Sequence, residues 1–160
     1  MTDRARWTDA PCRLGYVRLT ANDHAVTAID LLDAPADAPP GAVRDDEGLA
    51  TWREAVVALL ADPARRPDLP LDPGGTPFQA AVWAAVAAIP VGVTRSYKEL
   101  AAAIGAPGAE RAVGAAVGRN PLAVVVPCHR VVGADGALRG YRWGVQRKAA
   151  LLDLERPRLL

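Results

Sequence analysis

Fifteen residues near the middle of the chain, ADPARRPDLPLDPGG at positions 61–75, contain four prolines and end in a pair of glycines. Proline lacks a backbone N–H and fixes its own φ angle, so neither a helix nor a central strand can continue through this stretch. Such a composition is typical of a linker. We therefore expect the 160-residue chain to fold as two parts: residues 1–72, including the linker from about residue 61, and residues 73–160.

The part before the linker is predicted to hold a small sheet and one helix. The segments GYVRLTA and AVTAIDLL, within residues 14–32, alternate apolar and more polar residues, and Asn22-Asp23 between them favours a turn. Residues 33–46 are rich in Pro, Ala and Asp and are expected to form a loop. Residues 49–60 show helical periodicity, with one apolar face made of Trp52, Val56, Leu59 and Leu60.

The part after the linker is predicted to be mainly helical. A helix is expected to begin at Thr76, with Pro77 in its first turn, and to end before Pro90. The apolar, β-branched run LAVVV at 122–126 predicts a short buried strand or an extended segment. A last helix is expected over residues 145–154.

A helix-turn-helix is expected between these elements. Ser96 and Glu99 have the spacing of a capping box, which predicts a helix that begins there and runs to Ile104. Residues 105–108 form a short Gly/Pro turn, and a further helix is expected over residues 110–117. Two short helices joined by a tight turn that contains glycine are typical of a helix-turn-helix.

The net charge of +1 hides an uneven distribution. Residues 1–91 hold 8 Lys and Arg against 13 Asp and Glu, whereas residues 92–160 hold 11 against 5. This asymmetry favours a polyanionic partner for the C-terminal part.

Composition also excludes several classes of protein. Two cysteines, Cys12 and Cys128, are too few for a disulfide scaffold and indicate a reducing, cytoplasmic compartment. With only His24 and His129 besides, and no paired ligand spacing, we expect no zinc or other metal site. The charged N-terminus has no apolar core of a signal peptide, and no apolar run is long enough to span a membrane.

Cys128 is a candidate nucleophile. A lone cytoplasmic cysteine is most often a buried core residue. Here Pro127 stiffens the backbone before it, and His129 and Arg130 follow, two groups that are expected to lower a thiol pKa and favour the thiolate. His129 is the obvious base, and Glu155 is a candidate to orient it.

The predicted helix at 110–117 is unusual for one that reads the major groove. Long basic side chains stand only near its ends, at Arg111 and Arg119, and the residues between are small, including Ala112, Gly114 and Ala115. Small residues suit close approach to a groove wall, as in minor-groove binding. Packing of the same Ala/Gly face against a neighbouring helix is the alternative, and composition does not separate the two.

Residues 75–155 resemble the O6-alkylguanine-DNA alkyltransferase family. The resemblance is carried by GTPFQAAVWAAVAAIPVGVTRSY, by RAVGAAVGRNP and by PCHRV at matched spacing, and covers about half the chain. It implies an α+β fold, with a small ribonuclease-H-like, non-catalytic N-terminal domain and a mainly helical C-terminal domain whose helix-turn-helix is winged-helix-like. The N-terminal part is similar only in pattern.

The resemblance also implies a role for each matched residue. Cys128 would accept the alkyl group, His129 would take the thiol proton through a water, and Glu155 would orient that histidine. Asn120 would support the active-site turn, Tyr97 would help to rotate the nucleotide and protonate the base, and Arg111 would fill the space of the extruded base. The remaining contacts to substrate or DNA are expected from Tyr141 and Val131 at the pocket, from Lys148 in its outer shell, and from Ala112, Gly114, Ala115 and Arg119.

The expected reaction is a single irreversible transfer of an alkyl group, mainly methyl, from O6-alkylguanine in double-stranded DNA, reached by base flipping from the minor-groove side. It needs no cofactor, and the protein is expected to act as a monomer. Arg142 and Trp143 are bulky and are expected to narrow the pocket mouth against large adducts such as benzyl. Two alternatives are a non-catalytic protein that binds alkyl lesions and a helix-turn-helix transcription regulator; PCHRV disfavours the first and the Ala/Gly-rich helix the second.

Overall fold

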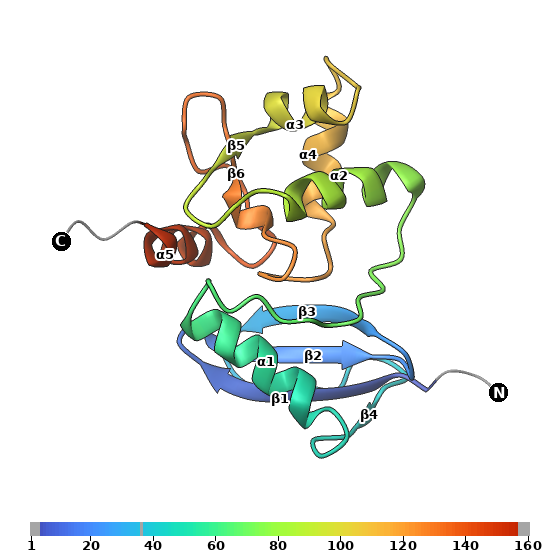
Figure 1. The fold of residues 1–160 in the computed structure, drawn as a ribbon. Helices are drawn as coiled ribbons and strands as arrows, with labels where there is room; N and C mark the ends of the chain where they lie inside the picture. Colours follow the sequence, from blue (N-terminus) through green and yellow to red (C-terminus); the bar gives the residue numbers. More distant parts are fainter. Residues whose placement is uncertain (1–3, 36, 157–160) are drawn as a thin grey trace. The chain divides into compact units, whose positions relative to one another are not determined.

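A computed structural model describes residues 4–35 and 37–156 of the chain (Figure 1). The described residues combine helices with a small sheet, which confirms the α+β class. Contacts within the chain divide it into two compact units. The first unit runs to Gly74 and takes in Pro121–Val125, five residues that the sequence analysis grouped with the C-terminal part. The second consists of Gly75–Asn120 and the residues from Val126 onward.

The first unit is built on a four-stranded sheet with the order β3-β2-β1-β4 (Figure 1). Its strands are β1 (Arg6–Cys12), β2 (Gly15–Ala21), β3 (Val26–Leu32) and the short β4 (Val43–Arg44). The first three pair antiparallel in sequence order, and β4 runs parallel to β1. Strands β2 and β3 confirm the two predicted segments. Sequence reasoning missed β1, whose segment RWTDAPC contains charges and a proline, and missed β4, which lies inside the expected loop.

One helix packs against this sheet. It is α1 (Ala50–Ala61), which matches the predicted helix and contacts β1. Val56, Leu59 and Leu60 are buried, whereas Trp52 on the same predicted face is only half-buried. The apolar stripe of α1 therefore supplies the core of the first unit together with the inward residues of β2 and β3.

The outer edge of β3 is covered by two non-strand segments of the same unit. Val26 forms an isolated bridge with Leu71 of the Pro-rich segment, and Ile29 forms one with Leu122. The Ile29 amide donates to the Pro121 carbonyl at 2.8 Å, and the Ala123 amide donates to the Ile29 carbonyl at 3.1 Å. These contacts pair backbone groups that would otherwise form an open sheet edge.

The run at 122–126 is not a regular strand, although it is mostly buried. It makes one bridge and then turns, because Val124 has a φ angle of +68°. A β-branched residue rarely adopts this left-handed conformation, and the strain costs on the order of 1–3 kcal/mol. The expectation of an extended segment therefore holds only for its first residues.

Four helices make up most of the second unit. They are α2 (Pro77–Ala87), α3 (Tyr97–Ala103), α4 (Glu110–Gly118) and α5 (Val145–Glu155), and each matches a predicted helix to within a few residues. The capping box of Ser96 and Glu99 is present, and Thr76 and Gln79 form a second one. These caps satisfy amide groups of the first turn, so both helices begin where the sequence indicates.

Helices α3 and α4 are joined by a tight turn and pack on each other and on α2. The indole N–H of Trp83 on α2 donates to the Ala116 carbonyl of α4 at 2.8 Å, in the buried interior. The parallel two-residue strands β5 (Arg95–Ser96) and β6 (Val131–Val132) join the entry of α3 to the segment after Cys128. This packing holds α3, α4 and the Cys128 segment as one body.

Within the described part of the chain, no helix combines the length and the apolar character needed to cross a membrane.

Candidate active site

Cys128 lies in a cavity of about 330 Å³ in the second unit. Its walls come from α3, α4 and the loop before α5. The lining residues are Tyr97, Gly114, Val117, Gly118, Cys128, Gly140, Tyr141 and Arg142. The cavity therefore brings together the predicted nucleophile, both predicted pocket tyrosines and two glycines of the helix rich in small residues.

Cys128 opens a single turn of 3₁₀ helix, Cys128–Arg130, directly after Pro127. Its side chain is only 3% exposed. The side-chain amide of Asn120, which is completely buried, donates to the Cys128 sulfur at 3.2 Å and to the Val126 carbonyl at 2.9 Å. Asn120 thus links the end of α4 to the turn that carries the thiol.

The thiol is not activated in the way that the sequence predicts. Burial raises the pKa of Cys128 to about 11, although the Asn120 hydrogen bond and the charge of Lys148 act to lower it. The expectation that the neighbouring cations favour a resting thiolate is therefore wrong. At neutral pH Cys128 is a protonated thiol, so a base must remove its proton during the reaction.

The side chain of Arg130, which was expected to act on the Cys128 thiol, pairs with Glu155. Its Nε atom lies 2.6 Å from one carboxylate oxygen and 3.1 Å from the other, and its Nη1 atom donates to the Ile89 carbonyl at 2.6 Å. Its charge is therefore used within the unit to neutralise a buried carboxylate.

The predicted pair of His129 and Glu155 is present. The Nε2 atom of His129 lies 3.1 Å from each oxygen of the Glu155 carboxylate, and both side chains are buried. Burial raises the pKa of Glu155, but hydrogen bonds with His129 and Arg130 outweigh this effect and lower it overall. Burial also lowers the pKa of His129, against the influence of Glu155. The pair is therefore a carboxylate and a neutral imidazole at neutral pH.

This pairing determines which ring nitrogen of His129 can act. With Glu155 ionised, Nε2 carries the hydrogen and donates it to the carboxylate. The Nδ1 atom then offers a lone pair, and it is buried without a hydrogen-bond partner among the described residues. Nδ1 is thus a proton acceptor held in place by the pairing on the other side of the ring.

Two tyrosines complete the cavity. Tyr97 is the first residue of α3 and is half-buried, and burial raises its pKa. The hydroxyl of Tyr141 is buried and has no hydrogen-bond partner in the described part of the chain. Burial, and then the nearness of Cys128, raise the pKa of Tyr141 well above its usual value. Both hydroxyls are therefore neutral proton donors beside the thiol.

The sequence of the second unit matches a known family model. Residues 77–157 fit the DNA-binding domain of 6-O-methylguanine DNA methyltransferase, which spans more than half of the chain. The methylated-DNA–protein-cysteine methyltransferase of Mycolicibacterium paratuberculosis is 44% identical over 152 residues, 94% of this chain and 91% of that protein. This chain belongs to the methylated-DNA–protein-cysteine methyltransferase family.

Solved structures support the assignment to this methyltransferase family. The crystal structure of Mycobacterium tuberculosis O6-methylguanine methyltransferase has a TM-score of 0.83 and 39% identity, covering 95% of this chain and 93% of that one. The structure of Mycobacterium tuberculosis OGT in complex with DNA has a TM-score of 0.77 and 42% identity, covering 95% and 92%.

In this member of the methyltransferase family, helix α4 exposes several of its small residues. Arg111, Ala112, Ala115 and Arg119 are exposed, whereas Val113, Ala116 and Val117 are buried. The alternative in which the exposed alanines pack on a neighbouring helix is therefore wrong for Ala112 and Ala115. Gly114 is only half-exposed because it faces Tyr97: a β-carbon there would lie 3.7 Å from the tyrosine ring.

Lys148 and Val131, the remaining predicted contacts, lie behind the cavity wall. Lys148 is buried, and its Nζ atom donates to the carbonyls of Arg139 and Gly140, each at 3.4 Å, so it holds the loop that forms one wall. Burial lowers the pKa of Lys148. Val131 is completely buried in β6 and is not a lining residue.

Sequence reasoning placed Arg142 and Trp143 together at the pocket mouth, and this is wrong for Trp143. Arg142 lines the cavity, but Trp143 is buried and packs edge-on against Tyr141, with ring centroids 5.3 Å apart. The contacts of Arg142 with the end of α4 were also missed, because they join residues more than twenty positions apart.

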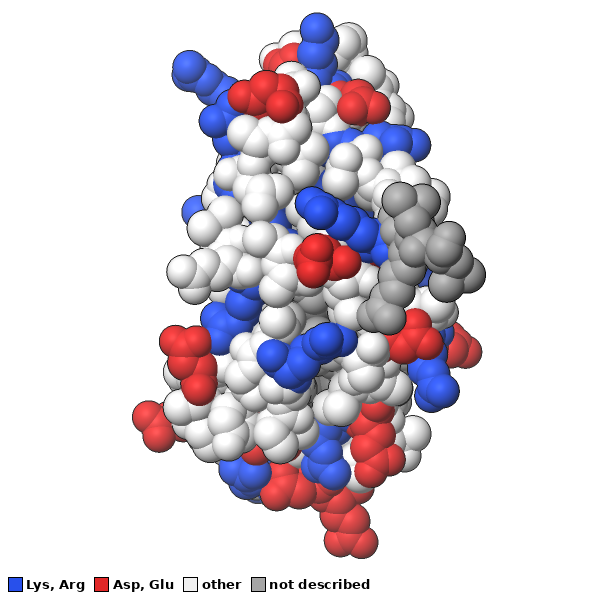
Figure 2. Space-filling view, turned by 90° about the vertical axis from the view of Figure 1, so that its left-hand side faces the viewer, with Lys and Arg blue, Asp and Glu red and all other residues white. Residues whose placement is uncertain are grey.

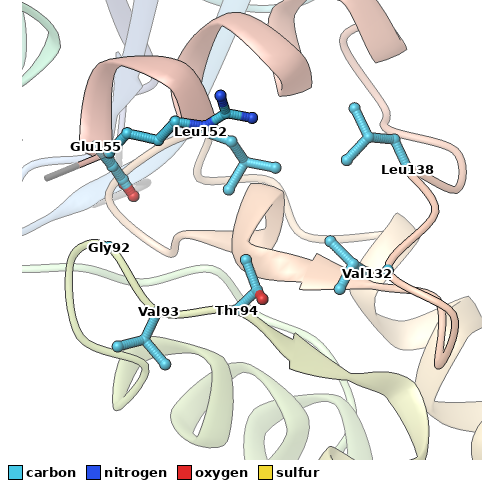
Figure 3. Close-up of a pocket in the computed structure, with 9 residues that line it drawn as sticks. Gly92, Val93, Thr94, Val132, Leu138, Leu152 and Glu155 are labelled. Carbon is cyan, nitrogen blue, oxygen red and sulfur yellow. The ribbon is translucent and has the colours of Figure 1, made fainter.

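A second cavity of about 310 Å³ lies among α5, β6 and the segment before β5. Figure 3 shows that its walls are largely aliphatic, with Val93, Val132, Leu138 and Leu152 around it. Glu155 lines this second cavity and not the first, whereas Cys128 and Tyr97 line the first and not the second. We therefore assign the chemistry to the cavity that holds the thiol.

Charge on the surface is mixed on the face drawn in Figure 2, where Lys and Arg side chains alternate with Asp and Glu. No continuous basic patch is visible among the described residues there. By contrast, the exposed side of α4 offers Arg111 and Arg119 with small residues between them. Helix α4 is thus the better candidate for contact with a nucleic-acid backbone.

Proposed function

We propose that this chain repairs alkylated DNA by transferring the alkyl group, mainly methyl, from O6-alkylguanine in double-stranded DNA to Cys128. The observation that supports this best is the buried thiol, hydrogen-bonded to Asn120 and followed by the His129–Glu155 pair. A thiol, a neutral imidazole and a carboxylate are the parts needed to make a thiolate on demand. The transfer needs no cofactor.

The first step is removal of the thiol proton. His129 accepts it at Nδ1, through one water, while Nε2 donates to Glu155. Glu155 stabilises the resulting imidazolium, and the amide of Asn120 stabilises the thiolate. Because burial keeps the thiol protonated at rest, this proton transfer is a step of the reaction itself.

The thiolate then attacks the alkyl carbon in line with the bond to O6. The sulfur–carbon bond forms as the carbon–oxygen bond breaks, and the bonding electrons leave with the guanine, which takes up a proton. Tyr97 lines the cavity and is the proposed proton donor to the base. The products are unmodified guanine and an S-alkyl cysteine, a thioether that no neighbouring group can cleave, so each molecule acts once.

The base must leave the DNA stack to reach a buried sulfur. We propose that α4 enters the minor groove with its small residues against the groove wall, and that Arg111 fills the space of the flipped nucleotide. The exposure of Arg111, Ala112 and Ala115 supports this. Tyr141 would flank the alkyl group within the cavity.

Several finer features are part of the same proposal. The first unit is proposed to be a ribonuclease-H-like, non-catalytic domain, with α3 and α4 in a winged-helix-like arrangement in the second. We propose that the protein acts as a monomer in the cytoplasm, where reducing conditions keep a reactive thiol available. Light scattering of the purified protein, alone and with DNA, tests the monomer.

The mass of the protein after incubation with duplex DNA containing O6-methylguanine tests the reaction. A gain of one methyl group on the peptide that contains Cys128, absent from Cys128→Ala, is the expected result. Binding to the lesion without a gain of mass would favour the non-catalytic alternative. Sequence-specific binding to unmodified DNA would favour a transcription regulator.

A further inference from the structure

Arg142 lies between the end of α4 and the pocket loop, which is the segment at residues 133–144 between β6 and α5. Its Nη1 atom donates to the Asn120 carbonyl at 3.1 Å and reaches the Arg119 carbonyl at 3.4 Å. Carbonyls at the carboxyl end of a helix have no partner within the helix, and a positive charge is favourable there. Arg142 therefore serves as a cap for α4 that comes from a distant part of the sequence.

The residue that Arg142 holds is the one that contacts the nucleophile. The carbonyl of Asn120 accepts from Arg142, and its side-chain amide donates to the Cys128 sulfur at 3.2 Å. Asn120 is completely buried, so its backbone and side chain have little freedom to move independently. A shift of the Asn120 backbone would thus move the hydrogen bond to the sulfur.

The rest of the loop is anchored around Arg142. Lys148 holds the carbonyls of Arg139 and Gly140, and Trp143 is buried, with the Arg142 guanidinium 5.4 Å from its ring centre. Tyr141 and Arg142 between these anchors line the cavity. The guanidinium thus spans from the loop wall of the cavity to the α4 wall, both of which border the thiol.

We propose that Arg142 is a positioning residue for alkyl transfer: by tying the pocket loop to the carboxyl end of α4, it holds Asn120 in place to hydrogen-bond the Cys128 sulfur. This inference rests on the proposed function and deepens it. An exposed arginine near α4 has a simpler alternative role, which is contact with a DNA phosphate. The two roles differ in which step of the reaction they affect.

The test compares Arg142→Ala and Arg142→Lys with Arg139→Ala. Arg139 lies on the same loop and is exposed, but its side chain pairs with Asp135, so its loss removes the same charge without touching Asn120. Single-turnover kinetics with duplex O6-methylguanine DNA separates affinity from the transfer rate at saturation. Free O6-methylguanine as substrate reports transfer without any DNA contact.

A positioning role predicts that Arg142→Ala slows transfer at saturating duplex and from the free base by a similar factor, roughly threefold to tenfold, which is the effect of losing one ordinary hydrogen bond. Its affinity for DNA should fall no more than that of Arg139→Ala. Arg142→Lys keeps a donor and should recover part of the rate. The charge of Arg142 also lowers the pKa of Cys128 directly, so iodoacetamide labelling of the Cys128 peptide across pH should show the thiol titrating higher in Arg142→Ala than in Arg142→Lys, which keeps the charge.

The proposal is overturned if Arg142→Ala weakens DNA binding but transfers from the free base at the wild-type rate, because a phosphate contact would do this. It is also overturned if neither rate changes. Thermal melting of each variant checks that it is folded. If Arg142→Ala is unfolded and inactive, Arg142→Lys decides the question. Its rate of transfer from free O6-methylguanine must then be below that of the wild type. If the wild-type protein itself gains no methyl group, the proposed function fails instead.

Discussion

The Nε atom of Arg130 lies 2.6 Å from the Glu155 carboxylate, and both side chains are almost completely buried. His129 shares the same carboxylate, so one acid orients the base and neutralises an internal cation. A single substitution at Glu155 therefore affects stability and chemistry together.

Glu155→Gln is expected to lower the free energy of unfolding by about 3–5 kcal/mol, because it leaves the Arg130 charge buried without its partner. Urea unfolding at neutral pH measures this. Asp153→Asn is the matched control on the same helix: Asp153 is exposed and only weakly paired with Arg156, so its loss should change stability by less than about 0.5 kcal/mol. Equal effects of the two substitutions would contradict the role given to Glu155.

The pairing of the Glu155 carboxylate with His129 and Arg130 also predicts that the stability of the fold depends on pH. The folded pKa of Glu155 is lowered, so its contribution is complete above the unfolded value, roughly 4.3, and is lost as pH falls through the folded pKa. The wild type should therefore lose its advantage in the free energy of unfolding over Glu155→Gln as the pH drops below about 4. A difference between the two proteins that stays constant down to pH 2 would show that Glu155 is not ionised in the fold.

Cys128 in the free protein is expected to react slowly with iodoacetamide at neutral pH. Its pKa is raised to about 11 by burial, so the labelling rate should keep rising through pH 9 and 10. Peptide mass spectrometry separates Cys128 from Cys12, and protein unfolded in urea is the control with an accessible thiol. A labelling rate that is already level near pH 7 would mean that the thiolate exists before substrate binds.

Arg111→Ala is expected to slow transfer from duplex DNA by roughly tenfold or more while leaving transfer from free O6-methylguanine unchanged. The reason is that Arg111 is exposed on α4, outside the cavity, and is proposed to act only on the flipped nucleotide. Arg65→Ala removes an equally positive, exposed side chain from the first unit and controls for net charge. Loss of the free-base reaction in Arg111→Ala would place the residue in the chemical step.

Benzyl transfer is expected to be much slower than methyl transfer. Tyr141 and Arg142 line the cavity, and Trp143 packs behind Tyr141 and limits its movement. Trp143→Ala should therefore increase the ratio of the benzyl to the methyl rate, measured with the two free bases. A wild-type protein that accepts benzyl as fast as methyl would refute this steric limit.

Local signals in the sequence predicted most of the second unit. Pro77 indicates where α2 begins, the capping box of Ser96 and Glu99 indicates where α3 begins, and the PCHRV motif identifies the nucleophile with its base. These features depend on residues a few positions apart, which is the range over which sequence reasoning is strongest.

Features that depend on distant residues were not predictable in this way. Arg130 was expected to act on the thiol beside it, but its partner, Glu155, is 25 positions away. The pKa of Cys128 depends on burial from all sides, which a neighbouring cation in the sequence does not reveal. Strand β1 is stabilised by pairing with β2 and β4, although its own composition is poor for a strand.

The edge of β3 has a practical consequence for anyone who wishes to produce the second unit by itself. Pro121–Val125 fold with the first unit, where Leu122 pairs with Ile29. Without that partner the run LAVVV, uncharged and rich in β-branched residues, would be presented to solvent close to the nucleophile. Such runs seed intermolecular β-pairing. A shortened protein that begins at Gly75 should therefore aggregate unless this run is made more polar.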